Sequence, residues 1–171
     1  MVIFIMWYYF YDIVTAPGVM IHELGHAFFC WLGKVKIYKI KLFQLGEIAG
    51  YVEHEEPQKF YQHVFVSFGP LIANTLVAMV LFAGIKAPYV DYHNALYLWL
   101  GIAIGLHAIP STGDANALWS AAKRRFWRNP FVFVAFPLIA LLYFLNILKR
   151  WRIHFLYTAW LLFVAIVWLK K

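Results

Sequence analysis

The stretch PGVMIHELGHAFFCWL, residues 17–32, sets three ionisable side chains, His22, Glu23 and His26, within an apolar run. In a helix, residues four apart lie on the same face, so the two imidazoles would lie one above the other. Histidines with this H-E-x-x-H spacing can bind one zinc ion, and the glutamate between them can act as a general base. Ionisable groups are costly in hydrocarbon and usually mark a functional site there. The alternative is a chance motif whose side chains make only structural hydrogen bonds.

The composition indicates a membrane protein. The chain has 171 residues, of which 64% are hydrophobic and only 13% are charged. A soluble domain of this length would carry roughly a quarter charged residues. Because there is too little polar surface to cover a globule, we expect an all-α polytopic protein with residues 1–171 forming a single integral membrane domain.

Charged residues divide the sequence into successive apolar runs. These runs are 1–33, 60–85, 94–112, 130–148 and 155–169. Each of the four later runs is near the roughly 17–25 residues that a spanning helix needs, although the last is short. Pro17-Gly18 interrupts the first run, where a helix would break or restart, so Met1–Ala16 is either a short separate span or half of a kinked one. The sequence therefore predicts five or six transmembrane helices.

The fifteen lysines and arginines predict the orientation. If the helix that ends at Gly33 ends on side A, successive crossings assign eleven of them to side A and four to side B. Side A holds Lys34, Lys36, Lys39, Lys41, Lys59, Lys123, Arg124, Arg125, Arg128, Lys170 and Lys171, and side B holds Lys86, Lys149, Arg150 and Arg152. The positive-inside rule makes side A cytoplasmic. The lipid bilayer is thus an expected partner, and nucleic acid is not, because the basic residues are scattered at helix ends.

Residues 35–54 have a strand-like pattern between the first two well-defined helices. Apolar and β-branched residues alternate with lysines over 35–43, and a second such segment, 48–54, follows a turn that contains Gly46. This pattern predicts a small β-hairpin. The alternation slips at Tyr38-Lys39, which indicates a β-bulge. A plain cytoplasmic loop is the alternative.

A catalytic zinc site needs a third protein ligand and an open fourth position. The H-E-x-x-H motif lies close to side A, and the run 94–112 ends on the same side in the segment LHAIPSTGD, residues 106–114. Pro110 would break that helix before Asp114. Asp114 is therefore the expected third ligand. Its alternative role is the N-cap of a helix over Ala115–Lys123, and both roles are compatible.

Three further residues are weaker candidates. His107 could bind the metal or hydrogen-bond to one of its ligands. Asn74 follows Gly69-Pro70, and it could satisfy backbone groups between packed helices or hold a substrate backbone. Cys30 is expected to be a small buried apolar residue.

These motifs together resemble the site-2 protease family of intramembrane zinc metalloproteases. The resemblance covers residues 18–120, and it implies a three-helix catalytic core with further transmembrane helices at 130–148 and 155–169. It also implies that His22, His26 and Asp114 hold one Zn2+ ion and that Glu23 is catalytic. The family commonly shows a second proline and an Asp-Gly pair near its aspartate, whereas this chain has PSTGDA at 110–115 and no PDZ-like domain.

The chemistry expected from these residues is hydrolysis of a peptide bond in a membrane-embedded substrate, with Glu23 as the base. The hairpin could pair with an extended substrate segment. One alternative is a non-catalytic zinc-containing scaffold or chaperone, although a structural zinc site has no need of a base. A metal or proton transporter is a further alternative, but no internal repeat is evident. The sequence does not indicate an oligomeric state.

Overall fold

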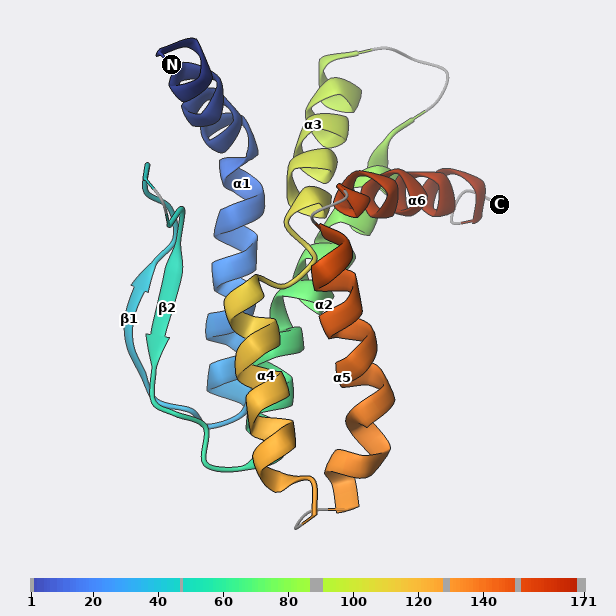
Figure 1. Ribbon diagram of the computed structural model, residues 1–171. Coiled ribbons are helices and arrows are strands. Elements are labelled where there is room, and N and C mark those ends of the chain that lie inside the picture. Colours follow the sequence, from blue (N-terminus) through green and yellow to red (C-terminus); the bar gives the residue numbers. More distant parts are fainter. Residues whose placement is uncertain (1, 47, 87–90, 128–129, 150–151, 169–171) are drawn as a thin grey trace.

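A computed structural model describes residues 2–46, 48–86, 91–127, 130–149 and 152–168 (Figure 1). These residues are mostly helical, and a two-stranded sheet lies beside the helices. The elements, in chain order, are α1 (Val2–Leu32), β1 (Ile37–Lys41), β2 (Tyr51–His54), α2 (Phe60–Gly84), α3 (Tyr92–Leu106), α4 (Thr112–Arg125), α5 (Pro130–Lys149) and α6 (Ile153–Trp168).

Three helical segments are long and apolar enough to cross a membrane, which indicates a membrane protein. They are Tyr9–Leu32, Phe60–Gly84 and Pro130–Ile147. The expected five or six spans are not confirmed among the described residues. Only part of the run 94–112 is helical, because α3 has 15 residues and ends at Leu106. The run 155–169 corresponds to α6 (Ile153–Trp168), which is 16 residues long and lies across the direction of α5 in Figure 1.

Of the two alternatives for Met1–Ala16, a separate span is wrong, because α1 continues through Pro17-Gly18 as one 31-residue helix. The other alternative, half of a kinked helix, agrees with Figure 1, in which the first turns of α1 are tilted relative to the rest. Proline lacks a backbone N–H, so it weakens the hydrogen bonding of the preceding turn. Trp99 Nε1 of α3 donates to the carbonyl oxygen of Val14 at 3.1 Å, so α3 contacts α1 in the turn before the proline. In an apolar surrounding the helix remains the best way to satisfy the backbone on both sides of the proline.

The helices α1 and α2 approach closely at their glycines. A Cβ added to Gly25 would lie 3.0 Å from Pro70 Cα, and one added to Gly69 would lie 3.0 Å from the carbonyl oxygen of Gly25. Small residues let helix backbones meet in this way in membranes. The Gly69-Pro70 pair therefore brings α2 against the turn of α1 that carries the H-E-x-x-H motif.

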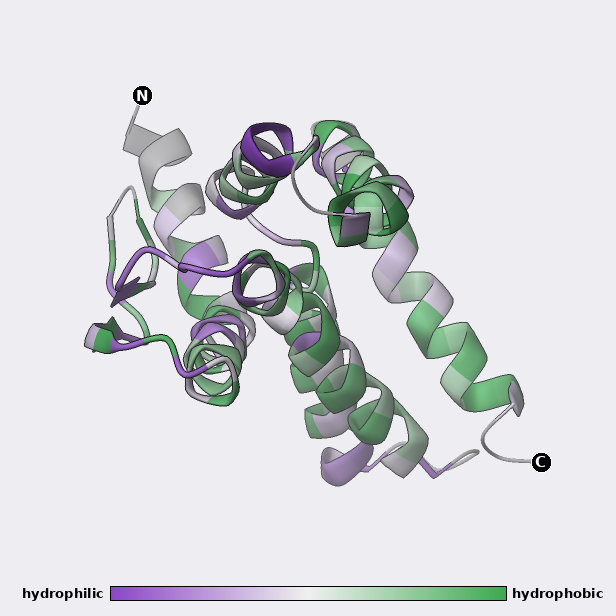
Figure 2. Cartoon of the chain, turned by 90° about the horizontal axis from the view of Figure 1, so that it is seen from below, coloured by the Kyte–Doolittle hydropathy of each residue, from purple (hydrophilic) through white to green (hydrophobic). Residues whose placement is uncertain are grey.

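The predicted hairpin is confirmed, and so is its bulge. β1 and β2 pair antiparallel, with Ile37 opposite His54 and Lys39 opposite Glu53. Tyr38 is therefore the extra residue of the bulge, at the point where the alternation slips. The hairpin lies on the outer side of α1 (Figure 1), and it is more hydrophilic than the helices of membrane-spanning length (Figure 2).

Two clusters of buried side chains join the remaining helices. Leu118 and Ala122 of α4 pack with Val132 and Ile139 of α5 and with Phe60 at the start of α2. The second cluster joins α2, α3 and α6, and its buried members are Ala78, Phe82, Ile104, Leu161 and Ala165. The first cluster thus packs α4 against α2, which itself packs against α1.

Candidate metal centre

Three side chains from two distant parts of the chain converge near the C-terminal half of α1. His22 and His26 are buried, with exposed fractions of 9% and 7%. The Nε2 atoms of His22 and His26 lie 3.9 and 3.4 Å from Oδ2 of Asp114 in the first turn of α4. One potential ligand atom from each residue lies within 4.8 Å of the other two, so the three residues could hold a metal ion.

Backbone carbonyls fix the orientation of both imidazoles. His22 Nδ1 lies 2.7 Å from the carbonyl oxygen of His107, and His26 Nδ1 lies 2.9 Å from that of Val66. A carbonyl oxygen only accepts, so each Nδ1 carries the proton and donates it. The Nε2 lone pair of each neutral ring is then directed at the centre of the cluster, as in most histidine–metal sites.

A helix cap positions Asp114. Ser111 is the N-cap of α4, and its Oγ and backbone N–H donate to Asp114 Oδ2 at 2.6 and 2.9 Å. The Asp114 backbone N–H donates back to Ser111 Oγ at 3.2 Å, which completes a capping box. Asp114 is thus the third residue of the helix and not its N-cap, and α4 begins at Thr112, three residues earlier than expected. Ser67 Oγ of α2 also donates to the backbone oxygen of Asp114 at 3.2 Å.

This donor set fits a cation. With both Nδ1 atoms already protonated, two neutral rings would present Nε2 lone pairs to a carboxylate, which is repulsive unless a proton or a metal ion lies between them. Two imidazoles and one carboxylate suit zinc, and they leave a coordination position open.

Glu23 lies between the two histidines in sequence and faces a polar cavity. Its exposed fraction is 7%. The cavity has a volume of about 450 Å³ and is bordered by the three clustered residues, by the N-terminus of α4 and by β2 with the loop before it. Gly50 of that loop lies directly over Glu23, since a Cβ added there would be 2.8 Å from Glu23 Cγ. The hairpin therefore covers the carboxylate.

Two of the weaker candidates, Asn74 and His107, have structural contacts near the cluster. Asn74 is fully buried, and its Nδ2 donates to the carbonyl oxygens of Gly18 and Ile104 at 3.1 and 3.0 Å. It thus ties α2 to α1 and α3. His107 is the C-cap of α3 and not a residue inside that helix as expected. Its carbonyl oxygen, and not its imidazole, contacts His22.

Several neighbours of the cluster were not expected from the sequence. Ser111 had a signal, because Ser-x-x-Asp is the pattern of a capping box. His63 had no such signal, and it is buried, with an exposed fraction of 5%. His63 and His54 border a second polar cavity of about 240 Å³ on the other side of Asp114. Cys30 is fully buried, as predicted.

Comparison with known proteins gives no family assignment. No family model matches the chain, and no curated protein and no solved structure matches it either. The function of this centre must therefore be argued from its geometry.

Proposed function

We propose that the chain is an intramembrane zinc metalloprotease of the site-2 protease type, which hydrolyses peptide bonds in or near membrane-spanning segments. One observation carries the proposal. The Nε2 atoms of His22 and His26 and the Oδ2 atom of Asp114 converge beside Glu23, in a cavity whose other wall is a β-strand.

His22, His26 and Asp114 would hold one Zn2+ ion. Bound there, zinc supplies Lewis acidity, which makes water a better nucleophile near neutral pH and a carbonyl carbon more electrophilic. The backbone carbonyls behind both histidines keep the rings in the required tautomer and orientation. The capping box does the same for the carboxylate of Asp114.

Glu23 is the proton carrier of the reaction. Its carboxylate accepts a proton from the attacking water as the new C–O bond forms, and then donates it to the nitrogen as the C–N bond breaks. The products are a carboxylic acid and an amine, and Glu23 returns to its starting state. The covering hairpin limits the access of bulk solvent to this carboxylate.

Strand β2 provides a surface for the substrate. Within the described part of the chain, β2 pairs with β1 alone, so its other edge has backbone groups that can pair with an extended peptide. Tyr51, Val52 and His54 of β2 border the cavity. A helical substrate hides its carbonyls in hydrogen bonds, and pairing with β2 would hold it unwound beside Glu23.

The centre is proposed to face the cytoplasmic side of the membrane. The end of α1, the start of α2 and the end of α4 lie together at one end of the molecule (Figure 1). Most lysines and arginines belong to the segments at this end, and such residues favour the cytoplasm.

The decisive experiment replaces Glu23 and supplies a membrane peptide. Glu23→Gln keeps the size of the side chain and the histidine ligands, so the variant should bind zinc like the wild type. Loss of a general base should lower cleavage about a hundredfold to ten-thousandfold. Glu55→Gln, at an exposed carboxylate that follows β2 and borders neither polar cavity, is the matched control and should cleave normally. Undiminished cleavage by Glu23→Gln would refute the mechanism, and failure of the wild type to cleave would favour a zinc-containing scaffold or a transporter.

A further inference from the structure

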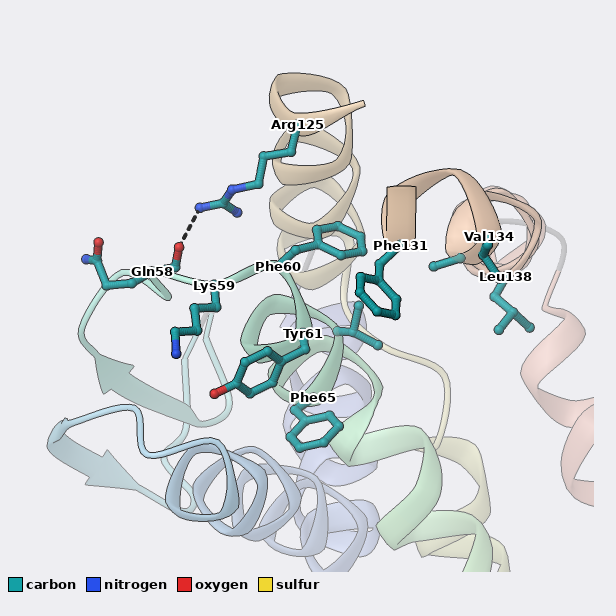
Figure 3. Close-up of a pocket in the computed structure, with 11 residues that line it drawn as sticks. Gln58, Lys59, Phe60, Tyr61, Phe65, Arg125, Phe131, Val134 and Leu138 are labelled. Carbon is teal, nitrogen blue, oxygen red and sulfur yellow. Dashed lines mark hydrogen bonds between the residues drawn. The ribbon is translucent and has the colours of Figure 1, made fainter. Parts of the chain in front are cut away.

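A large apolar cavity lies on the side of α2 that faces away from the metal centre. Its volume is about 660 Å³, and Figure 3 shows side chains of α2 on one side of it and side chains of α5 on the other. The apolar lining residues are Phe60, Tyr61, Val64, Phe65, Phe131, Val134, Ala135 and Leu138. Both helices have the length and apolarity to cross a membrane, so lipid acyl chains surround the opening.

A second cavity continues the first along the same two helices. It has a volume of about 210 Å³, and four residues border both cavities: Val64, Phe65, Ala135 and Leu138. The second cavity extends to Ile72 on α2, thirteen residues beyond Lys59. At 1.5 Å per helical residue this corresponds to about 20 Å. One leaflet with its headgroups is also about 20 Å thick, so the groove has the length of one phospholipid.

Two cations lie at one end of this α2–α5 groove. Lys59 precedes α2 and is exposed, and Arg125 is the last residue of α4. Arg125 Nη2 donates to the carbonyl oxygen of Gln58 at 2.9 Å (Figure 3). Its Nη1 is buried and has no hydrogen-bond partner among the described residues. The positive charge of Arg125 at this end of the cavity favours an anionic group such as a phosphate.

We propose that the α2–α5 groove binds one anionic phospholipid, with its phosphate at Arg125 and Lys59 and one acyl chain along Phe65 and Leu138. A cationic end and an apolar continuation of one-leaflet length match both parts of such a lipid. The site is separate from the metal centre, and the proposal is independent of the proposed protease activity.

The test measures retained lipid by native mass spectrometry of the full chain, after reconstitution with equal amounts of phosphatidylglycerol and phosphatidylcholine that carry the same acyl chains. The wild type should retain one phosphatidylglycerol in preference to phosphatidylcholine. Leu138→Trp should block the groove and lower retention at least about fivefold. Leu141→Trp is its matched control, because both leucines are similarly exposed, at 59% and 52%, and Leu141 borders neither cavity. Val134→Trp, at a position 77% exposed, is a second block should the first variant fold poorly.

A charge variant tests recognition of the headgroup. Lys59→Gln with Arg125→Gln should lower the preference for phosphatidylglycerol, by about fivefold for each charge removed. Lys36→Gln with Lys123→Gln removes two exposed cations that do not border the groove, and should leave the preference unchanged. Equal retention of both lipids by the wild type would overturn the proposal, as would normal lipid retention by both tryptophan block variants. If an added transmembrane peptide occupied the groove and no lipid were retained, the groove would be assigned to a polypeptide. This result would also overturn the proposal.

Discussion

The helices α1 and α5 are both apolar and long enough to span a membrane, yet they are held in place in different ways. The buried face of α1 includes His22, Glu23 and His26, and carbonyls from two other helical regions fix both of its imidazoles. The buried residues of α5 are apolar, namely Val132, Ile139 and Leu142. Buried polar groups need partners of defined geometry, whereas apolar contacts tolerate small changes in shape. The position of α1 is therefore specified by directional hydrogen bonds, and that of α5 mainly by the shape of its apolar contacts.

The largest effect is expected when a ligand of the centre is removed. Asp114→Ala should lower zinc affinity by more than about 100-fold, because even residues that only support a ligand contribute 10–100-fold. Metal analysis of the purified protein measures this directly. Asp91→Ala is the matched control, since Asp91 also lies at the start of a helix, as the N-cap of α3, but lies outside the cluster. Normal zinc content in Asp114→Ala would exclude Asp114 as a ligand.

A smaller effect is expected when the support of that ligand is removed. Ser111→Ala deletes the 2.6 Å hydrogen bond to Asp114 Oδ2 and the N-cap of α4. Zinc affinity should fall about 10–100-fold, and the free energy of unfolding should fall by about 1 kcal/mol. Competition with a chelator measures the affinity, and Ser111→Thr should restore most of it. If zinc affinity stayed normal in Ser111→Ala, the hydrogen bond from Ser111 would not be needed to position Asp114.

The smallest effect is expected on the exposed face of α5. Leu141→Ala should change the free energy of unfolding by less than about 0.5 kcal/mol, because its side chain packs on little of the protein. Leu142→Ala, at the buried neighbouring position, should cost about 2 kcal/mol or more and shows that the unfolding measurement can detect a loss. Equal losses of unfolding free energy in both variants would show that the outer face of α5 also makes specific contacts.

The sequence predicted the parts of the site that depend on local spacing. The histidines four apart, the break at Pro110 that brings Asp114 to the same end, and the bulge at Tyr38 all follow from helix or strand periodicity. The number of spans could not be predicted, because charged residues mark where an apolar run ends but not the direction of the helix that it forms. The helix α6 is apolar and yet lies across the direction of α5. The burial of His63 also depends on tertiary packing, since its neighbours in sequence include exposed residues.

Contacts between residues far apart in the chain could not be predicted from local patterns. Trp99 of α3 donates to the carbonyl oxygen of Val14 on α1, and the two residues are 85 positions apart. Two backbone carbonyls orient His22 and His26, and any residue type can supply such an oxygen.

The capping box at the start of α4 also bears on the order in which the protein matures. The capping box holds the Asp114 carboxylate in position once α4 has folded. No metal ion is therefore needed to orient this candidate ligand. Many small zinc domains acquire their fold only on metallation. If the centre holds zinc as proposed, folding can come first and binding of the ion afterwards, at residues that are already in position.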